Sequence, residues 1–244
     1  MKTTISIQDL TKEYDGKIVV DHVTLSIKEG ELYGLLGVNG AGKTTLIKML
    51  CGLTKPTNGN ATILDHDLQN NIEQIKKVIA ISPQETAIAP NLTVRENLEL
   101  FAGIHGFSKE ETKVKTNNMM DVFALHPYEK QKSKKLSGGW QRKLSIALAL
   151  ITEPQILFLD EPTLGLDVLA RRELWNLIEQ LKMSTTIILT THYLEEASSL
   201  CDRICVMKEG QVKAIGTVNE LMILTSTQNF EDAFVELVTK GVTV

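Results

Sequence analysis

The sequence of 244 residues predicts an α/β fold around a mainly parallel sheet. Two apolar runs, at residues 156–159 and 186–190, are typical of buried strands, and residues 171–181 between them repeat apolar side chains at helical spacing. Another apolar run, at 32–36, leads through a glycine-rich turn into a helical pattern at 46–50. Strands that alternate with helices pair in parallel, because each helix carries the chain back across the sheet before the next strand begins.

The N-terminal part, near residues 3–30, predicts a separate antiparallel β subdomain. The runs Ile5–Ile7 and Val23–Ile27 alternate polar and apolar side chains, which is typical of strands with one buried face. We expect the start of the chain to be a strand and not a signal peptide, because a signal peptide carries a continuous apolar stretch.

Residues 85–150 predict a helical subdomain inserted into the α/β core. In Thr93–Glu96 and again in Ser108–Glu111, a hydroxyl side chain stands three residues before a glutamate, which is the capping-box spacing at which helices begin. The apolar run at 78–81, just before the insertion, predicts a short buried strand. The whole chain, 1–244, is expected to form one domain that contains this insertion.

The C-terminal part predicts a hairpin at 204–212, followed by a C-terminal extension at 215–244. Phe230, Phe234 and Leu237 recur at helical spacing in this extension. We therefore expect an amphipathic helix that packs on the core.

The glycine-rich turn predicts a phosphate-binding loop. It consists of Gly37, Val38, Asn39, Gly40, Ala41, Gly42, Lys43 and Thr44, with Thr45 next in the helix. Glycines permit a tight turn whose N–H groups face an anion, and the helix N-terminus adds partial positive charge. Lys43 has the length to reach β- and γ-phosphates, and the Thr44 hydroxyl is a ligand for Mg²⁺. The alternative is a turn that only connects two elements, but the spacing and the Lys-Thr ending favour a P-loop NTPase core.

Two carboxylates and a histidine follow the predicted strands. Asp160 leaves a buried strand, where it is placed to bind Mg²⁺ through water, and Glu161 is placed to polarise an attacking water. Acidic residues at strand ends also serve as helix caps, which is the alternative for both. His192 follows another strand and could stabilise a γ-phosphate, although a lone histidine there is more often structural.

A second serine- and glycine-containing turn opens another helical run. Ser137, Gly138 and Gly139 form a possible anion site at a helix N-terminus, and the alternative is a simple N-cap serine in a tight turn. Two phosphate-binding elements in one chain make sense only if two copies share each nucleotide.

With these motifs in order along nearly the whole chain, the sequence resembles the ATP-binding subunit of an ABC transporter. Residues 136–139 resemble that family's signature motif, which contacts the ATP held by the opposite subunit, and residues 165–167 resemble its dimer-contact loop. The resemblance further implies that Tyr14 stacks on adenine, that Gln84 contacts Mg²⁺ and its waters, and that His192 is the switch histidine. The fifth signature position departs from the family's glutamine, because Trp140 occupies it.

The resemblance implies ATP and Mg²⁺ as cofactors and a homodimer or heterodimer of ATP-binding subunits. It also implies a separate transmembrane permease subunit, with the chain cytoplasmic and peripheral on the cytoplasmic face of the cell membrane. We expect the surface around residues 84–100 to dock a helix of that permease, with Glu85 and Arg95 exposed on it. A short match at 230–234 weakly resembles the ABC-2-type exporter branch, so an exporter is expected.

Composition bears on the other functional classes. The net charge is −4, so the chain lacks the basic excess of proteins that bind nucleic acid, and no nucleic acid partner is expected. Three cysteines are too few for a disulfide framework. The alternative function is a soluble ABC-type ATPase acting on ribosome or DNA, which usually has two such domains or long coiled coils. A module that binds ATP without hydrolysing it is a further alternative, against which Glu161 and His192 argue.

Overall fold

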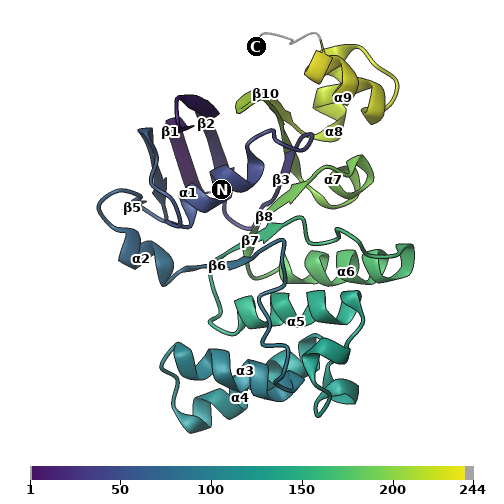
Figure 1. Ribbon diagram of the computed structural model, residues 1–244. Helices are drawn as coiled ribbons and strands as arrows, with labels where there is room; N and C mark the ends of the chain where they lie inside the picture. Colours follow the sequence, from purple (N-terminus) through teal and green to yellow (C-terminus); the bar gives the residue numbers. More distant parts are fainter. Residues whose placement is uncertain (1, 240–244) are drawn as a thin grey trace.

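The computed structural model describes residues 2–239, which form two sheets and the helices packed around them (Figure 1). The first sheet is antiparallel and has the order β2-β1-β4-β5. Its strands are β1 (Thr3–Tyr14), β2 (Lys17–Lys28), β4 (Asn58–Ile63) and β5 (His66–Asp67). Ile5 faces Ile27 and Ile7 faces Leu25 across the β1–β2 pair, so the predicted N-terminal β subdomain is confirmed.

The second sheet has the order β10-β9-β3-β8-β7-β6 and is parallel except for its edge strand β10. Its strands are β3 (Leu32–Leu36), β6 (Ile79–Ser82), β7 (Ile156–Asp160), β8 (Thr186–Thr191), β9 (Arg203–Lys208) and β10 (Gln211–Gly216). All residues of β3, β7 and β8 are buried, as expected for parallel strands covered on both faces. The predicted α/β fold is confirmed.

Helices cover both faces of this sheet and extend beyond it (Figure 1). They are α1 (Lys43–Leu50), α2 (Ile72–Lys76), α3 (Val94–Ile104), α4 (Lys109–Val122), α5 (Gly138–Leu150), α6 (Val168–Leu181), α7 (Leu194–Leu200), α8 (Val218–Thr225) and α9 (Phe230–Thr239). Two short 3₁₀ helices, η1 (His126–Tyr128) and η2 (Ser133–Lys135), precede α5. The capping boxes expected at Thr93 and Ser108 begin α3 and α4. Among residues 2–239, no helix is both long and apolar enough to cross a bilayer.

The core divides into clusters because side chains alternate along each strand. Ile156 and Phe158 of β7 pack toward α1 and the antiparallel sheet, whereas Leu157 and Leu159 pack toward α5 and α6. The second cluster continues into α3 and α4, which lie beyond α5 at the far end of the molecule (Figure 1).

The C-terminal helices pack on the β9 side of the sheet, where Phe230 and Leu237 of α9 are buried. This agrees with the expected amphipathic helix. The last part of the expected C-terminal extension, residues 240–244, lies outside the described residues.

The strand register brings the predicted site together at one edge of the sheet. Leu36 pairs with Thr191, and Asp160 pairs with Thr190, so the segments that follow β3, β7 and β8 leave the sheet side by side. Ser82, at the end of β6, pairs with Leu159, which places the next residues of the chain beside the same edge.

The segment 58–76 carries no clear signal of regular structure in the sequence. Asn58, Gly59 and Asn60 disfavour a strand by composition, yet β4 forms because it completes the antiparallel sheet beside β1. The missed helix α2 has only five residues, too few to give a periodic signal.

Candidate functional site

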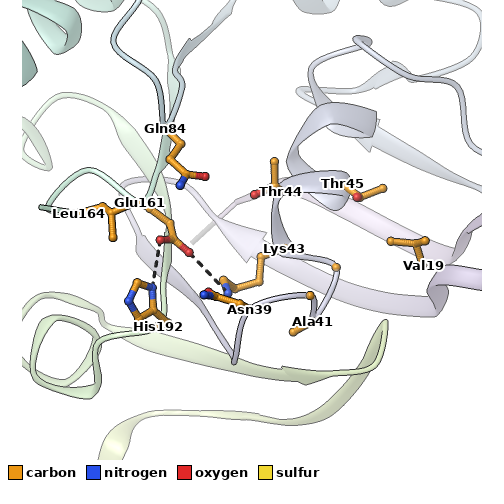
Figure 2. Close-up of a pocket in the computed structure, with 12 residues that line it drawn as sticks. Val19, Asn39, Ala41, Lys43, Thr44, Thr45, Gln84, Glu161, Leu164 and His192 are labelled. Carbon is orange, nitrogen blue, oxygen red and sulfur yellow. Dashed lines mark ion pairs between the residues drawn. The ribbon is translucent and has the colours of Figure 1, made fainter.

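A cavity of about 360 Å³ opens where the carboxyl ends of β3, β7 and β8 meet (Figure 2). It brings together ten of the residues expected from the sequence: Asn39, Gly40, Ala41, Gly42, Lys43, Thr44, Thr45, Gln84, Glu161 and His192. Val19 and Leu164 also line it, and neither carried a sequence signal. Gly37 and Val38 belong to the loop without lining the cavity.

The loop between β3 and α1 depends on the absence of side chains at two glycines. A Cβ on Gly37 would lie 2.4 Å from the carbonyl oxygen of Met207, and one on Gly42 would lie 2.6 Å from that of Val19. Gly42 also has a φ of +98°, a conformation that other residues rarely adopt. The loop can therefore pass between β2 and the β9–β10 turn only with glycine at both positions.

The donors of the loop suit a polyphosphate. The N–H groups in the first turn of α1 have no partner inside the helix, and the N-cap Gly42 has no side chain to supply one. No acidic residue stands in that turn to compete with an incoming anion. The helix N-terminus therefore presents free N–H donors and partial positive charge to the cavity.

Lys43 is 5% exposed and curls back over the loop. Its Nζ donates to the carbonyl oxygens of Gly37 at 2.6 Å and Val38 at 3.3 Å. Burial lowers the pKa of Lys43, and the negative charges of Glu161 and Asp160 oppose that effect. An ammonium with only carbonyls and one distant carboxylate around it is well placed to exchange these partners for phosphate oxygens.

Asp160 lies under the first turn of α1 and receives two hydroxyl hydrogen bonds on the same oxygen. Thr44 Oγ1 donates to Asp160 Oδ1 at 3.1 Å, and Thr190 Oγ1 donates to it at 2.6 Å. Among the described residues, no group of three or more His, Cys, Asp or Glu side chains is arranged to hold a metal ion. One hydroxyl and one carboxylate fit Mg²⁺, which takes only one or two carboxylates from a protein and fills its shell with phosphates and water.

Glu161 lines the cavity between two basic side chains (Figure 2). One carboxylate oxygen lies 3.0 Å from His192 Nδ1, and the other lies 3.8 Å from Lys43 Nζ. The backbone of Glu161 has a φ of +46°, and its N–H donates to Thr190, to Oγ1 at 2.9 Å and to the carbonyl oxygen at 3.2 Å. Such conformations cost about 1–3 kcal/mol and occur often at functional sites. Here it turns the carboxylate into the cavity.

Ser137, Gly138 and Gly139 do not line this cavity. They begin α5, where Ser137 and Gly138 are exposed to solvent. Ser137 has the backbone of an N-cap, but its hydroxyl makes no capping hydrogen bond, so the simple N-cap alternative does not account for this serine. Its hydroxyl and the first N–H groups of α5 face solvent and are free to meet a second molecule.

Trp140 and Gln141, which follow these glycines, are partly buried and contact residues of the same chain. The Trp140 ring lies 4.5 Å from that of Tyr128, with Lys143 Nζ 4.2 Å above it. Gln141 Nε2 donates to the carbonyl oxygens of Ser133 and Leu136. Trp140, at the fifth signature position, thus packs against residues of the helical region of its own chain.

Tyr14 lies at the end of β1 and outside the cavity lining. Its side chain is 43% exposed, its hydroxyl is 3.3 Å from Thr54 Oγ1, and Lys12 Nζ lies 4.6 Å above its ring. The exposed ring, which lies next to Thr54 beyond the C-terminal end of α1, leaves a face on which a planar group could stack.

Comparisons with known proteins are consistent with this geometry. The ABC transporter family matches residues 20–164 of the chain. The Nod factor export ATP-binding protein I of Burkholderia thailandensis is 39% identical over 219 residues, which are 89% of this chain and 72% of the relative. The chain spans only 42% of the length of the first curated relatives that it matches, from Escherichia coli and Shigella flexneri.

Solved structures share the whole fold. One, described as the ATP-binding subunit of an ABC transporter, has a TM-score of 0.85 and 31% identity, covering 96% of this chain and 99% of the other. Another is the ATP-binding cassette MJ0796 as a dimer in a post-hydrolysis state with ADP and phosphate. It has a TM-score of 0.78 and 28% identity, covering 87% of this chain and 98% of the other.

Proposed function

Since the chain belongs to the ABC transporter ATP-binding family, we propose that it binds and hydrolyses ATP to drive transport through a separate membrane subunit. The observation that carries this proposal is the position of Glu161. A buried carboxylate between His192 and Lys43, facing a loop built to hold phosphates, has the chemistry of a general base for hydrolysis.

The residues of the cavity have different roles in phosphoryl transfer. Lys43 and the first-turn N–H groups of α1 bind the phosphates and neutralise charge that develops on them. Glu161 accepts a proton from the attacking water and orients it toward the γ-phosphate. His192 Nδ1 lies 3.0 Å from the Glu161 carboxylate and makes no hydrogen bond within the described residues, so the ring is free to donate toward the γ-phosphate.

Thr44 and Asp160 would hold Mg²⁺, with Gln84 contacting its waters. The hydroxyl and the carboxylate already meet at 3.1 Å, and Gln84 lines the same cavity. When bound, Mg²⁺ neutralises part of the charge on the phosphates.

Two ATP-binding subunits would share each nucleotide. The free Ser137 hydroxyl and the exposed start of α5 lie outside the cavity of their own chain, so they can serve only a nucleotide held by another subunit. The related cassette that was solved as a dimer with ADP and phosphate supports this arrangement. The second subunit is either a copy of this chain, in a homodimer, or a different ATP-binding subunit, in a heterodimer.

Steady-state release of phosphate from ATP in the presence of Mg²⁺ tests whether the chain hydrolyses ATP. The variant Tyr14→Ala tests whether the adenine ring stacks on Tyr14. We expect the substitution to raise the KM for ATP by about tenfold with little change in kcat, because stacking acts equally on ground and transition states. Lys17→Ala, on the next strand, is the matched surface control. An unchanged KM in Tyr14→Ala would show that another side chain holds the adenine.

The permease subunit is proposed to dock beside residues 84–100, which start at the cavity and continue into α3. The expectation that Arg95 is exposed was wrong. Its guanidinium lies 2.5 Å from Glu129 and 3.0 Å from Asn117 Oδ1, and its side chain is 27% exposed. Reversing its charge would therefore disrupt the helical subdomain itself. Glu85 is exposed, so it remains a suitable position for a surface test.

Glu85→Lys is expected to reduce co-purification with the permease while basal ATP hydrolysis stays within about twofold of wild type. Glu179→Lys, on the exposed side of α6, supplies the same charge change elsewhere and is expected to leave assembly unchanged. If Glu85→Lys co-purifies with the permease as well as Glu179→Lys and the wild type do, the docking surface lies outside this segment. With such a partner, the chain would be peripheral on the cytoplasmic face of the membrane, and the similarity to a Nod factor export protein supports export as the direction.

A further inference from the structure

Arg142 is a buried cation that the reaction described above does not use. It lies in the second turn of α5 and is 5% exposed. Within residues 2–239, no carboxylate lies close enough to form an ion pair with it. A buried arginine without a paired carboxylate is unusual, because burying a charge is costly unless other groups compensate.

The guanidinium is satisfied by two successive backbone carbonyls at the edge of the cavity. Nη1 donates to the carbonyl oxygen of Pro83 at 2.7 Å, and Nη2 donates to that of Gln84 at 2.5 Å. Burial lowers the pKa of Arg142, and the negative charge of the nearby Asp160 opposes that effect. The planar fork of arginine matches two adjacent acceptors, whereas a lysine ammonium at the same distance would reach one.

These two hydrogen bonds fix the backbone from which the Gln84 side chain extends into the cavity. A second polar link joins the same elements one turn further along α5, where Ser145 Oγ lies 3.1 Å from Ser82 Oγ. Of these two links, only the arginine reaches past the end of β6, to Pro83 and to Gln84, which lines the cavity. The helix that begins with Ser137 is thus tied to the segment that carries Gln84.

We propose that Arg142 is a positioning residue that aims Gln84 into the phosphate-binding cavity by holding the carbonyls of Pro83 and Gln84. The inference rests on the proposed function, because Gln84 matters there only if the cavity hydrolyses ATP. Without the guanidinium, two carbonyls lose their donors and the segment moves to find water. Gln84 then leaves the position from which it would contact the waters of Mg²⁺.

A double-mutant cycle between Arg142→Ala and Gln84→Ala tests the proposal in the full chain. Arg142→Ala is expected to lower kcat about tenfold with KM for ATP within about twofold, because the phosphate loop itself is untouched. Added to Gln84→Ala, it is expected to cause little further loss. Arg142→Lys, which keeps the charge but loses one of the two bonds, is expected to fall between wild type and Arg142→Ala.

Ser145→Ala is the matched control, since it removes a neighbouring hydrogen bond of the same helix without touching residues 83–84. Any loss that it causes is expected to add independently to that of Gln84→Ala. Thermal unfolding of each variant verifies that the chains are folded at the assay temperature. Full additivity of Arg142→Ala with Gln84→Ala, or wild-type kcat in Arg142→Lys, would overturn the proposal.

Hydrogen exchange without nucleotide separates this inference from the proposed function. In Arg142→Ala, amides in the segment 84–89 are expected to exchange at least about fivefold faster, whereas Ser145→Ala leaves them unchanged. Unchanged exchange in Arg142→Ala would refute the positioning role even in an active enzyme. If the wild-type chain releases no phosphate, the proposed function fails, while the exchange measurement still decides what Arg142 holds.

Discussion

Replacing Lys43 by alanine is expected to lower ATP hydrolysis by about 100- to 1,000-fold and to weaken nucleotide binding. The ammonium is the main positive charge at the loop, and Lys43 is 5% exposed, so its attraction to phosphate is only weakly screened. Its loss also leaves Glu161 without the lysine, 3.8 Å away, that offsets its charge beside an incoming polyanion. Steady-state phosphate release and equilibrium binding of ATP measure the two effects separately.

Two further variants make this result interpretable. Lys43→Met keeps most of the side-chain length but removes the charge and the N–H donors, so it is expected to match Lys43→Ala if the ammonium, and not the length of the side chain, is what matters. Lys48→Ala removes an exposed lysine from the same helix and is expected to hydrolyse ATP at the wild-type rate. If a folded Lys43→Ala chain hydrolyses ATP at the wild-type rate, the assignment of residues 37–44 as the phosphate-binding loop is wrong.

Glu161→Gln is expected to lower hydrolysis by at least about 100-fold while ATP binding persists. The amide keeps the shape of the side chain but is a far weaker base, so the attacking water keeps its proton. Removing the negative charge also removes repulsion toward the γ-phosphate, and affinity for ATP is therefore expected to stay equal or rise.

The control for this variant is Glu153→Gln, another glutamate with a positive φ, of +53°, which lies outside the cavity. It tests whether an amide in such a backbone conformation disturbs the fold by itself. Wild-type hydrolysis by a folded Glu161→Gln chain would show that another group accepts the proton.

Much of the site was predictable because its residues follow one another at fixed, short spacings in the sequence. The loop at 37–44 needs glycines, a lysine and a threonine in fixed order, and a strand and a helix flank it in the sequence as in the structure. Asp160 and His192 were found because polar residues that follow buried parallel strands meet at one edge of a sheet. The 3.0 Å contact between His192 and Glu161 depends on strand register, which the sequence does not state.

Features that depend on backbone acceptors or on neighbours far away in the chain were not predictable. The partners of Arg142 are carbonyls 58 and 59 residues earlier in the chain, and carbonyls carry no residue-type signal. Arg95 is of a residue type that usually lies at the surface, but Glu129, which follows η1, forms an ion pair with it. Val19 lines the cavity only because β2 lies beside the loop.

In the proposed dimer, ATP is enclosed between the loop at 37–44 of one subunit and Ser137–Gly139 of another. Light scattering coupled to size exclusion of Glu161→Gln with ATP and Mg²⁺ tests it most directly, since the chain binds ATP but does not consume it. We expect the Glu161→Gln chain to have the mass of a dimer with ATP and the mass of a monomer with ADP. Adding Ser137→Phe to Glu161→Gln is expected to abolish the ATP-dependent dimer. A Glu161→Gln chain that binds ATP and stays the mass of one chain, or a dimer that Ser137→Phe does not disturb, would contradict the shared site.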